Sequence, residues 1–255
     1  MGTLYIVATP IGNFKDITQR ALEVLRGADL IVCEDTRQTL KLLNHYEISK
    51  PLVSYFQHSK LSKIEYIAGQ LAQGKNIALV TDAGTPGISD PGGKLVNQLV
   101  SWSVGQGEAD KLKNRQTDEL KIVPIPGPCA AIAALSVSGF PTDKFIFMGF
   151  PPHKKGREKY FDEVAATKHT VVFYESTHRI LKTLEQLSAV LQIKPPLNLP
   201  LAKGEKERRL RQIVICRELT KMFETIYRGT AEEILKTLNS DKNNLKGEFV
   251  IIISK

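Results

Sequence analysis

Short apolar runs rich in β-branched residues alternate with amphipathic segments along the first half of the chain. Five such runs have the length of buried strands, at residues 3–8, 30–33, 51–56, 77–80 and 121–126. Between them, apolar residues recur at helical spacing, as in residues 17–28, where Asp16 is the expected helix cap, and in residues 61–73. Regular alternation of strands and helices predicts a parallel α/β sheet.

The pattern changes after Gly139, which ends a small-residue helix predicted at 130–138, with Pro141 preventing its continuation. Strands are then expected at 144–148, 170–174 and 247–254, with a pair of strands across 216–227 and a short helix at 231–238. Fewer helices among mixed strands are typical of an α+β domain. We therefore predict an N-terminal parallel-sheet α/β domain over residues 1–139 and a C-terminal α+β domain with a mixed sheet over residues 140–255.

Glycine- and proline-rich loops follow three of the predicted strands. The longest reads V-T-D-A-G-T-P-G-I-S-D-P-G-G from Val80 to Gly93, and shorter ones begin at Pro10 and Pro126. Such loops at the carboxyl ends of strands bind small molecules in α/β sheets. The long loop has neither a Walker lysine nor G-x-G-x-x-G spacing, and its charges are Asp82 and Asp90, which suit a ligand with cationic or hydroxyl groups. The alternative is a solvated turn in which glycine and proline only set geometry.

The net charge of +8 is concentrated in the second half, because residues 151–211 hold 13 Lys and Arg against 7 Asp and Glu. This excess favours an anionic macromolecule as partner, although basic enzymes without a nucleic-acid role are common. Three scattered cysteines form no metal-type pair, which predicts a reducing cytoplasm and no metal site. The longest apolar run, residues 249–253, is too short to span a membrane.

Charged clusters follow two other strands. Residues 34–37 read E-D-T-R, and residues 175–179 read E-S-T-H-R at a strand-to-helix junction. Both would lie where active-site groups gather, although Asp35 is equally well read as a helix cap with Arg37 as a surface charge. Basic residues also follow Phe150 and His153, and a second basic tract covers residues 203–211. These tracts would meet an RNA backbone or, alternatively, form solvated surface.

Several motifs together resemble those of the small-subunit rRNA (cytidine-2'-O)-methyltransferases of the tetrapyrrole methylase superfamily. They extend across nearly the whole chain: A-T-P-I-G-N (8–13), C-E-D-T-R (33–37), T-D-A-G-T-P-G-I-S-D-P-G (81–92), P-I-P-G-P-C-A (124–130), Y-E-S-T-H-R (174–179), C-R-E-L-T-K (216–221) and G-E-F-V-I-I-I (247–253). Any one block is weak evidence, whereas the ordered set is specific.

The resemblance implies S-adenosylmethionine as cofactor, bound between the two domains of a homodimer, and a cytidine ribose in the decoding region of small-subunit rRNA, or of the 30S subunit, as methyl acceptor. Carried over by motif, the cofactor residues are Pro10, Gly12, Asp82, Ala83, Gly84, Thr85, Pro126, Gly127, Pro128, Cys129, Ala130, Met148 and Tyr174. The substrate-facing residues are expected to be Glu34, Arg37, Lys154, Lys155, Arg157, Arg179, Arg208, Arg209 and Arg211.

A ribose hydroxyl is a weak nucleophile, so a general base would help the transfer, and Asp35, Glu175 and His178 are the candidates between which the sequence does not choose. Two other functions stay open. One is methylation of a small tetrapyrrole on the same fold, against which the basic tracts speak. The other is a non-catalytic ribosome-binding factor, against which the intact glycine loops speak.

Overall fold

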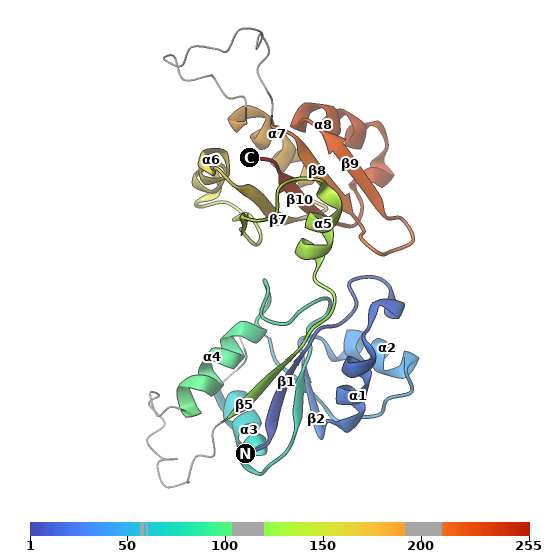
Figure 1. Ribbon diagram of the computed structural model, residues 1–255, viewed down its shortest axis with the longest axis vertical. Coiled ribbons are helices and arrows are strands. Elements are labelled where there is room, and N and C mark those ends of the chain that lie inside the picture. Colours follow the sequence, from blue (N-terminus) through green and yellow to red (C-terminus); the bar gives the residue numbers. More distant parts are fainter. Residues whose placement is uncertain (57–58, 60, 104–119, 192–210) are drawn as a thin grey trace. The chain divides into compact units, whose positions relative to one another are not determined.

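The alternation of strands and helices predicted for the first half builds a parallel sheet. In the computed structural model, which describes residues 1–56, 59, 61–103, 120–191 and 211–255, the chain divides into two units, Met1–Cys129 and Ala130–Lys255. The first sheet has the order β3-β2-β4-β1-β5, with every neighbouring pair parallel (Figure 1). Its strands are β1 (Thr3–Val7), β2 (Leu30–Cys33), β3 (Leu52–Ser54), β4 (Ile77–Leu79) and β5 (Lys121–Ile125). All five carboxyl ends therefore lie at one edge, called here the carboxyl edge.

Helices cover both faces of this sheet, which is why its strands are apolar throughout rather than alternating. Along β2, Leu30 and Val32 pack with α3 (Leu61–Ala72) and α4 (Gly92–Ser103), whereas Ile31 and Cys33 pack with α1 (Gln19–Gly27) and α2 (Thr36–His45). The prediction of an Asp16 cap for α1 was wrong. Residues Phe14–Asp16 form a separate 3-10 turn, η1, and the Thr18 hydroxyl caps α1 by accepting from the Ala21 N–H at 3.1 Å.

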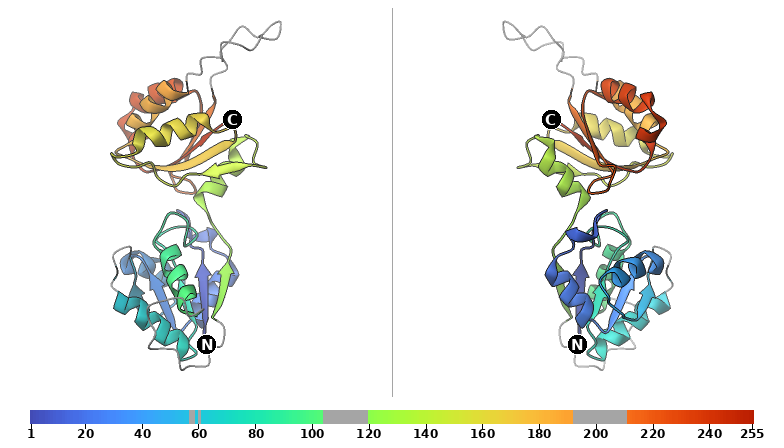
Figure 2. Two further views of the ribbon diagram at one scale, coloured as in Figure 1. Left: turned by 90° about the vertical axis from the view of Figure 1, so that its left-hand side faces the viewer. Right: turned by 90° about the vertical axis from the view of Figure 1, so that its right-hand side faces the viewer.

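The second unit has a mixed sheet with the order β6-β7-β10-β8-β9, which confirms the predicted fold class. Its strands are β6 (Phe145–Phe147), β7 (Thr170–Ser176), β8 (Ile213–Arg217), β9 (Thr225–Gly229) and β10 (Glu248–Ile253); β6 and β7 are parallel, and the other pairs are antiparallel. Helices α6 (Arg157–Ala166), α7 (Ile180–Val190) and α8 (Ala231–Ser240) cover one face, and a 3-10 turn, η3 (Lys242–Leu245), follows α8 (Figure 2). Phe161 of α6, Phe173 of β7 and Phe249 of β10 are fully buried in the core between these helices and the sheet.

The division between the units falls between Cys129 and Ala130 rather than after Gly139, because α5 (Ala130–Ser138) packs on the second sheet. Side chains of alternate strand residues on the face away from α6–α8, such as Val172 and Ile252, are also buried, and α5 lies on that face (Figure 2). Arg228 of β9 further ties α5 to the sheet by donating to the carbonyl oxygens of Val137 and of Ser138, the latter at 2.7 Å. The sequence shows the end of this helix correctly, with Gly139 at φ +76°, but not the sheet to which the helix belongs.

Within the described parts of the chain, no helix combines the length and the apolar character needed to cross a bilayer. The polar, aperiodic stretch at residues 103–119, which the sequence predicts to be a surface insertion, lies outside the described residues from residue 104 onward. So does the second basic tract up to residue 210, including Arg208 and Arg209.

Candidate functional site

Loops from neighbouring strands are joined at the carboxyl edge of the first sheet. Thr9, just after β1, exchanges two backbone hydrogen bonds with Gly84, just after β4: the Thr9 N–H donates to the Gly84 carbonyl at 2.9 Å, and the Gly84 N–H donates to the Thr9 carbonyl at 3.0 Å. The buried Thr9 hydroxyl also donates to the Thr81 carbonyl at 3.2 Å. The β1 and β4 loops therefore form one rigid unit.

The loop after β5 joins this unit through Thr85, whose hydroxyl donates to the Pro128 carbonyl at 2.9 Å. Glycine is required at the junction. Gly84 has φ +86°, and a Cβ there would meet Ile11 Cγ2 at 3.4 Å and the Pro128 oxygen at 3.7 Å. A Cβ on Gly127 would lie 3.0 Å from the Ala8 Cβ. We call residues 8–13, 81–91 and 126–129 the edge loops. Their close packing leaves backbone at the surface at Gly12, Ala83 and Gly127, which are exposed.

The long edge loop is shaped by its second carboxylate. Both oxygens of Asp90 accept from the Gly87 N–H, at 2.8 and 2.9 Å, and Oδ1 also accepts from the Gly92 N–H at 2.6 Å, where α4 begins. Asp90 is therefore occupied in holding the loop. Asp82 in the same loop is exposed, so its carboxylate is available to a ligand.

Asp35 has the structural role that the sequence left as an alternative. Its side chain caps α2 by accepting from the Arg37 N–H at 2.9 Å, and it pairs with the Arg37 guanidinium at 3.0 Å from Nε and 2.7 Å from Nη2. These bonds lower the pKa of Asp35 to about 2, so this carboxylate is a weak proton acceptor. The Asp35 N–H in turn donates to Asp82 Oδ1 at 3.0 Å, which connects the β2 and β4 loops.

Negative charge accumulates at this edge. Burial raises the pKa of Glu34, and the nearby carboxylates of Asp82 and Asp90 raise it further. Burial also raises the pKa of Asp82. The hydrogen bond from the Asp35 N–H lowers this pKa, and the negative charge of Asp35 raises it, so that the net shift is upward. An edge of this kind gains from a bound cation or hydroxyl donor, because either relieves repulsion between the carboxylates.

We predict that Glu34→Gln stabilises the protein at neutral pH. A carboxyl whose pKa is raised on folding contributes stability below its unfolded pKa and loses that contribution as the pH rises through the folded pKa. Removing the charge should raise the melting temperature at pH 7 by about 1–3 °C, with little change at pH 4. Thermal melts between pH 4 and 8 measure this, with the exposed Glu23 on α1 as control in Glu23→Gln. A lower melting temperature for Glu34→Gln at pH 7 would contradict the assignment.

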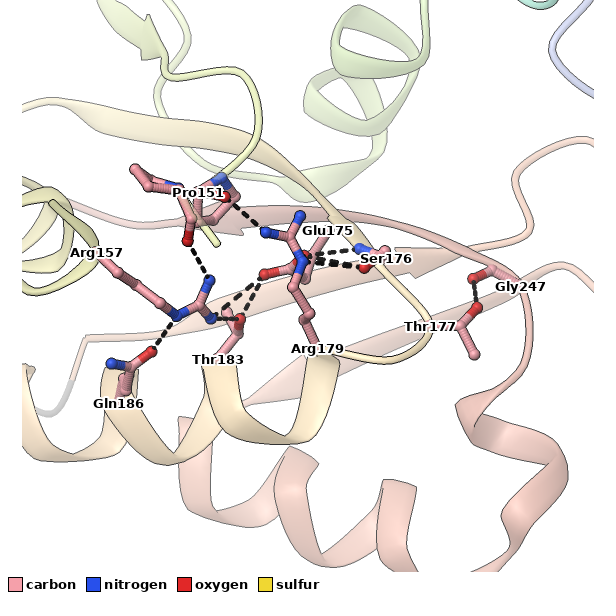
Figure 3. Close-up of polar contacts among 10 residues, drawn as sticks. Pro151, Arg157, Glu175, Ser176, Thr177, Arg179, Thr183, Gln186 and Gly247 are labelled. Carbon is pink, nitrogen blue, oxygen red and sulfur yellow. Dashed lines mark hydrogen bonds and ion pairs between the residues drawn. The ribbon is translucent and has the colours of Figure 1, made fainter. Parts of the chain in front are cut away.

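In the second charged cluster, Glu175 is buried inside the second unit, and Figure 3 shows its polar contacts. Glu175 on β7 has a fully enclosed side chain, paired with Arg179 Nε at 2.8 Å and lying 3.5 Å from Arg157 Nη2. The Thr183 hydroxyl donates to Glu175 Oε2 at 2.6 Å. Because every approach to the carboxylate is taken by protein groups, the geometry does not support Glu175 as a general base.

One predicted substrate contact, that of Arg157, is corrected in the same unit. The Arg157 side chain is only 4% exposed, so it cannot lie on an RNA-facing surface. Arg211 lies near the end of α6, donating from Nη1 to the Val164 carbonyl at 3.1 Å and from Nη2 to the Thr167 carbonyl at 2.7 Å, a favourable place for a cation. Arg179 is half-buried and paired with Glu175, whereas Lys154 and Lys155 are exposed as expected.

The remaining predicted residues of the second unit lie near β7. The Tyr174 ring packs on Phe147 and Phe150 at centroid distances of 5.1 and 5.4 Å, and the Ala131 N–H donates to the Tyr174 hydroxyl at 3.2 Å. Met148 is half-buried against the core of this unit, and His178 is exposed. Tyr174 thus links the start of α5, directly after the third edge loop, to the turn after β6.

Two residues that organise these sites, Thr9 and Thr183, were missed in the sequence, and for Thr85 only the contact that joins the loops was missed. The hydroxyls of Thr9 and Thr85 bind carbonyls 72 and 43 residues away, which no local spacing identifies, and Thr183 binds Glu175 across the junction between β7 and α7. Among the residues that the structure describes, no group of three or more His, Cys, Asp or Glu side chains is placed to hold a metal ion.

A parallel α/β unit with glycine loops at its carboxyl edge, followed by a mixed-sheet unit, defines a two-domain α/β class, and in α/β sheets such loops commonly bind small molecules. Residues 3–235 match the family model of the tetrapyrrole (corrin/porphyrin) methylases, and the chain belongs to this family.

Among its relatives, the chain is 45% identical to the ribosomal RNA small subunit methyltransferase I of Escherichia coli O157:H7, over 99% of this chain and 77% of that protein. It is 39% identical to the protein of the same name from a Hydrogenobaculum strain, over 99% of this chain and 95% of that protein. Solved structures share the fold at 17% identity. They include a Thermus thermophilus uroporphyrin-III-C-methyltransferase, with TM-score 0.59 and coverage of 100% and 95% of the two chains, and a cobalt precorrin-4 methyltransferase, with TM-score 0.61 and coverage of 99% and 94%.

Proposed function

We propose that this chain transfers a methyl group from S-adenosylmethionine to the ribose 2'-oxygen of a cytidine in the decoding region of small-subunit rRNA. The observation that carries the proposal is the similarity, at 39–45% identity over about the whole chain, to ribosomal RNA small subunit methyltransferases I from several bacteria. The edge loops support the choice of cofactor, and the basic turn after β6 supports RNA as the acceptor.

The residues at the carboxyl edge fit this cofactor. Exposed backbone at Gly12, Ala83 and Gly127 allows a flat, hydroxyl-rich ligand to approach the main chain closely. The charge of Asp82 suits a sulfonium, and the edge loops contain no lysine or arginine that would repel it. When bound, the cofactor supplies a methyl group made electrophilic by the positive sulfur. The chain's own part is to hold the acceptor oxygen in line with that methyl, which supplies much of the rate.

Of the three candidate bases, His178 is the one whose side chain is exposed. Asp35 is held in its ionised form by Arg37, and Glu175 is enclosed, whereas His178 is exposed on the segment that follows β7. We propose His178 as the group that takes the ribose proton. A histidine near neutral pH is well suited to this step.

The function is tested by incubating the protein with methyl-labelled cofactor and small subunits that lack the modification. Label should appear on one ribose, resistant to alkaline cleavage. Label on a base, or on an anionic tetrapyrrole offered in parallel, would overturn the choice of acceptor. Absence of cofactor binding in calorimetry, both for free protein and for protein bound to subunits, would favour a non-catalytic ribosome-binding factor.

RNA contact through Lys154 and Lys155 predicts a specific salt dependence. Each lysine that neutralises a phosphate adds about one unit to the slope of log affinity against log salt concentration. Lys154→Ala/Lys155→Ala should therefore weaken RNA binding at low salt and flatten that slope by about one to two units. Titrations of an rRNA fragment between 50 and about 300 mM salt measure it. An unchanged slope would assign both lysines to ordinary solvated surface.

We also propose that the protein works as a homodimer in the cytoplasm. Exposed apolar side chains on α5 and β6, such as Ile132, Val137 and Phe145, support a covered surface on the second unit. Three free cysteines, two of them buried, suit a reducing compartment where ribosomal subunits are found. Light scattering after size exclusion measures the oligomeric state, and a monomer at micromolar concentration would contradict the dimer.

A further inference from the structure

Protein stability alone does not explain why Glu175 is buried together with Arg157 and Arg179. Taking three charges out of water costs several kcal/mol per ion, and apolar residues of similar volume often replace such clusters without loss. Each Glu175 oxygen is nevertheless fully engaged. Oε1 accepts from the Ser176 N–H and from Arg179 Nε, both at 2.8 Å, and Oε2 accepts from the Thr183 hydroxyl at 2.6 Å. Because Glu175 contacts both guanidinium groups, it fixes the orientation of the Arg157 and Arg179 side chains.

Both arginines extend beyond Glu175 to the same piece of backbone. Arg179 Nη1 donates to the Pro151 carbonyl at 2.7 Å, and Arg157 Nη1 donates to the Pro152 carbonyl at 3.1 Å. Figure 3 shows the two guanidinium groups on either side of Glu175, each reaching towards the proline segment. Arg157 is itself held by Thr183 at 2.6 Å from Nη2. Two successive carbonyls are thus bound by two arginines that share one carboxylate.

The segment held in this way carries the exposed groups proposed to meet RNA. We call residues 149–156, between β6 and α6, the proline turn. It starts at Gly149, whose carbonyl accepts from the Tyr174 N–H at 2.8 Å. It ends at Gly156, which has φ +84° and is the N-cap residue of α6. Phe150 is 50% exposed, and Lys154 and Lys155 are exposed. Neither proline has an N–H, so backbone pairing inside the turn is reduced and the two arginines are the main anchors described for it.

We propose that Glu175 is a positioning residue that, through Arg157 and Arg179, holds the proline turn as a preformed RNA-binding surface. The inference rests on the proposed RNA acceptor. A turn already fixed in its bound shape avoids the entropy cost of ordering on binding, so the cluster acts on RNA affinity and not on the methyl-transfer step.

The main test is Glu175→Gln in the full-length protein. Hydrogen exchange followed by mass spectrometry should become faster in peptides covering residues 149–156, with peptides of the first unit unchanged. In methylation assays the KM for small subunits should rise by about tenfold, kcat should stay within about threefold, and calorimetric cofactor affinity should not change. If Glu175 were instead the general base, Glu175→Gln would reduce kcat by about 100-fold or more and leave KM unchanged.

Arg179→Lys is the second variant, in case Glu175→Gln does not fold. A lysine keeps the charge opposite Glu175, but its donors share one nitrogen and so do not reproduce the two separate nitrogens, Nε and Nη1, with which Arg179 reaches Glu175 and the Pro151 carbonyl. It should loosen the proline turn while leaving the core intact. The KM for subunits should again rise.

A cycle with Lys154→Ala/Lys155→Ala separates the outcomes. If the cluster acts through the turn, Glu175→Gln should weaken RNA binding strongly in the wild-type background and little in the double-alanine background. Equal loss in both backgrounds, or a loosened turn with unchanged RNA binding, would overturn the positioning role while leaving the methyltransferase proposal intact. Failure of the wild-type protein to bind or methylate small subunits would instead overturn the proposed function, and the hydrogen-exchange result would still report whether Glu175 fixes the turn.

Discussion

Gly84→Val is expected to raise the dissociation constant for S-adenosylmethionine by about 100-fold, or about 2.7 kcal/mol. Gly84 has φ +86°, where a β-branched residue is strongly disfavoured, and a Cβ there would already be in van der Waals contact with Ile11 and the Pro128 carbonyl. Because Gly84 also holds Thr9 through two backbone bonds, displacement would separate the edge loops from one another. Isothermal titration calorimetry measures the affinity directly.

Gly74→Val is the matched control. Gly74 has the same φ of +86°, but no heavy atom lies within 4 Å of a Cβ built there, and it lies before β4 rather than after it. Both variants should lose similar stability to backbone strain, whereas only Gly84→Val should lose cofactor affinity. If Gly74→Val weakens cofactor binding as much as Gly84→Val, the loss reflects general destabilisation, and the edge loops are not the cofactor site.

Arg217→Met is expected to lower the free energy of unfolding by about 2–3 kcal/mol, because it removes a buried, hydrogen-bonded charged side chain. Arg217 is only 8% exposed at the end of β8, and its guanidinium binds three carbonyls, those of Lys246, Asn243 and Phe223, at 2.7, 2.8 and 3.1 Å. Methionine fills much of the same volume but leaves these acceptors without a donor. Urea denaturation monitored by circular dichroism measures the loss.

Arg228→Met gives the comparison. Arg228 also donates to two carbonyls, on Val137 and Ser138, but it is exposed, so water replaces the lost donor. Its removal should cost less than about 1 kcal/mol. Equal effects of the two substitutions would show that burial of Arg217 is not what makes its hydrogen bonds matter.

The edge loops show how far the sequence reaches into the site. Glycines and prolines after strands predicted three ligand loops, and the parallel sheet confirms that the loops emerge from one edge. What stayed hidden is how the loops are joined. The hydroxyls of Thr9 and Thr85 bind carbonyls 72 and 43 residues away, and no local pattern signals partners at such separations.

The charged motifs after β2 and β7 look alike in sequence and differ in the structure. Asp35 remains near the surface as a helix cap beside the exposed Arg37, whereas Glu175 is enclosed by two arginines and a threonine. Burial decides between a reactive carboxylate and a structural one, and burial depends on which helix covers the strand end. For Glu175 that cover comes from α6 and α7, which supply Arg157 and Thr183.

The sequence by itself determined the fold class and the positions of the edge loops, because strand and helix periodicities and turn residues are local properties of the chain. Its ordered motifs also indicated the family to which the chain belongs. Only the tertiary structure decided that α5 belongs to the second unit, that Glu175 and Arg157 are buried and that the proline turn is anchored by two arginines. These features depend on contacts between residues distant in sequence, whose free energies are set by burial and by hydrogen-bond geometry that the folded chain alone creates.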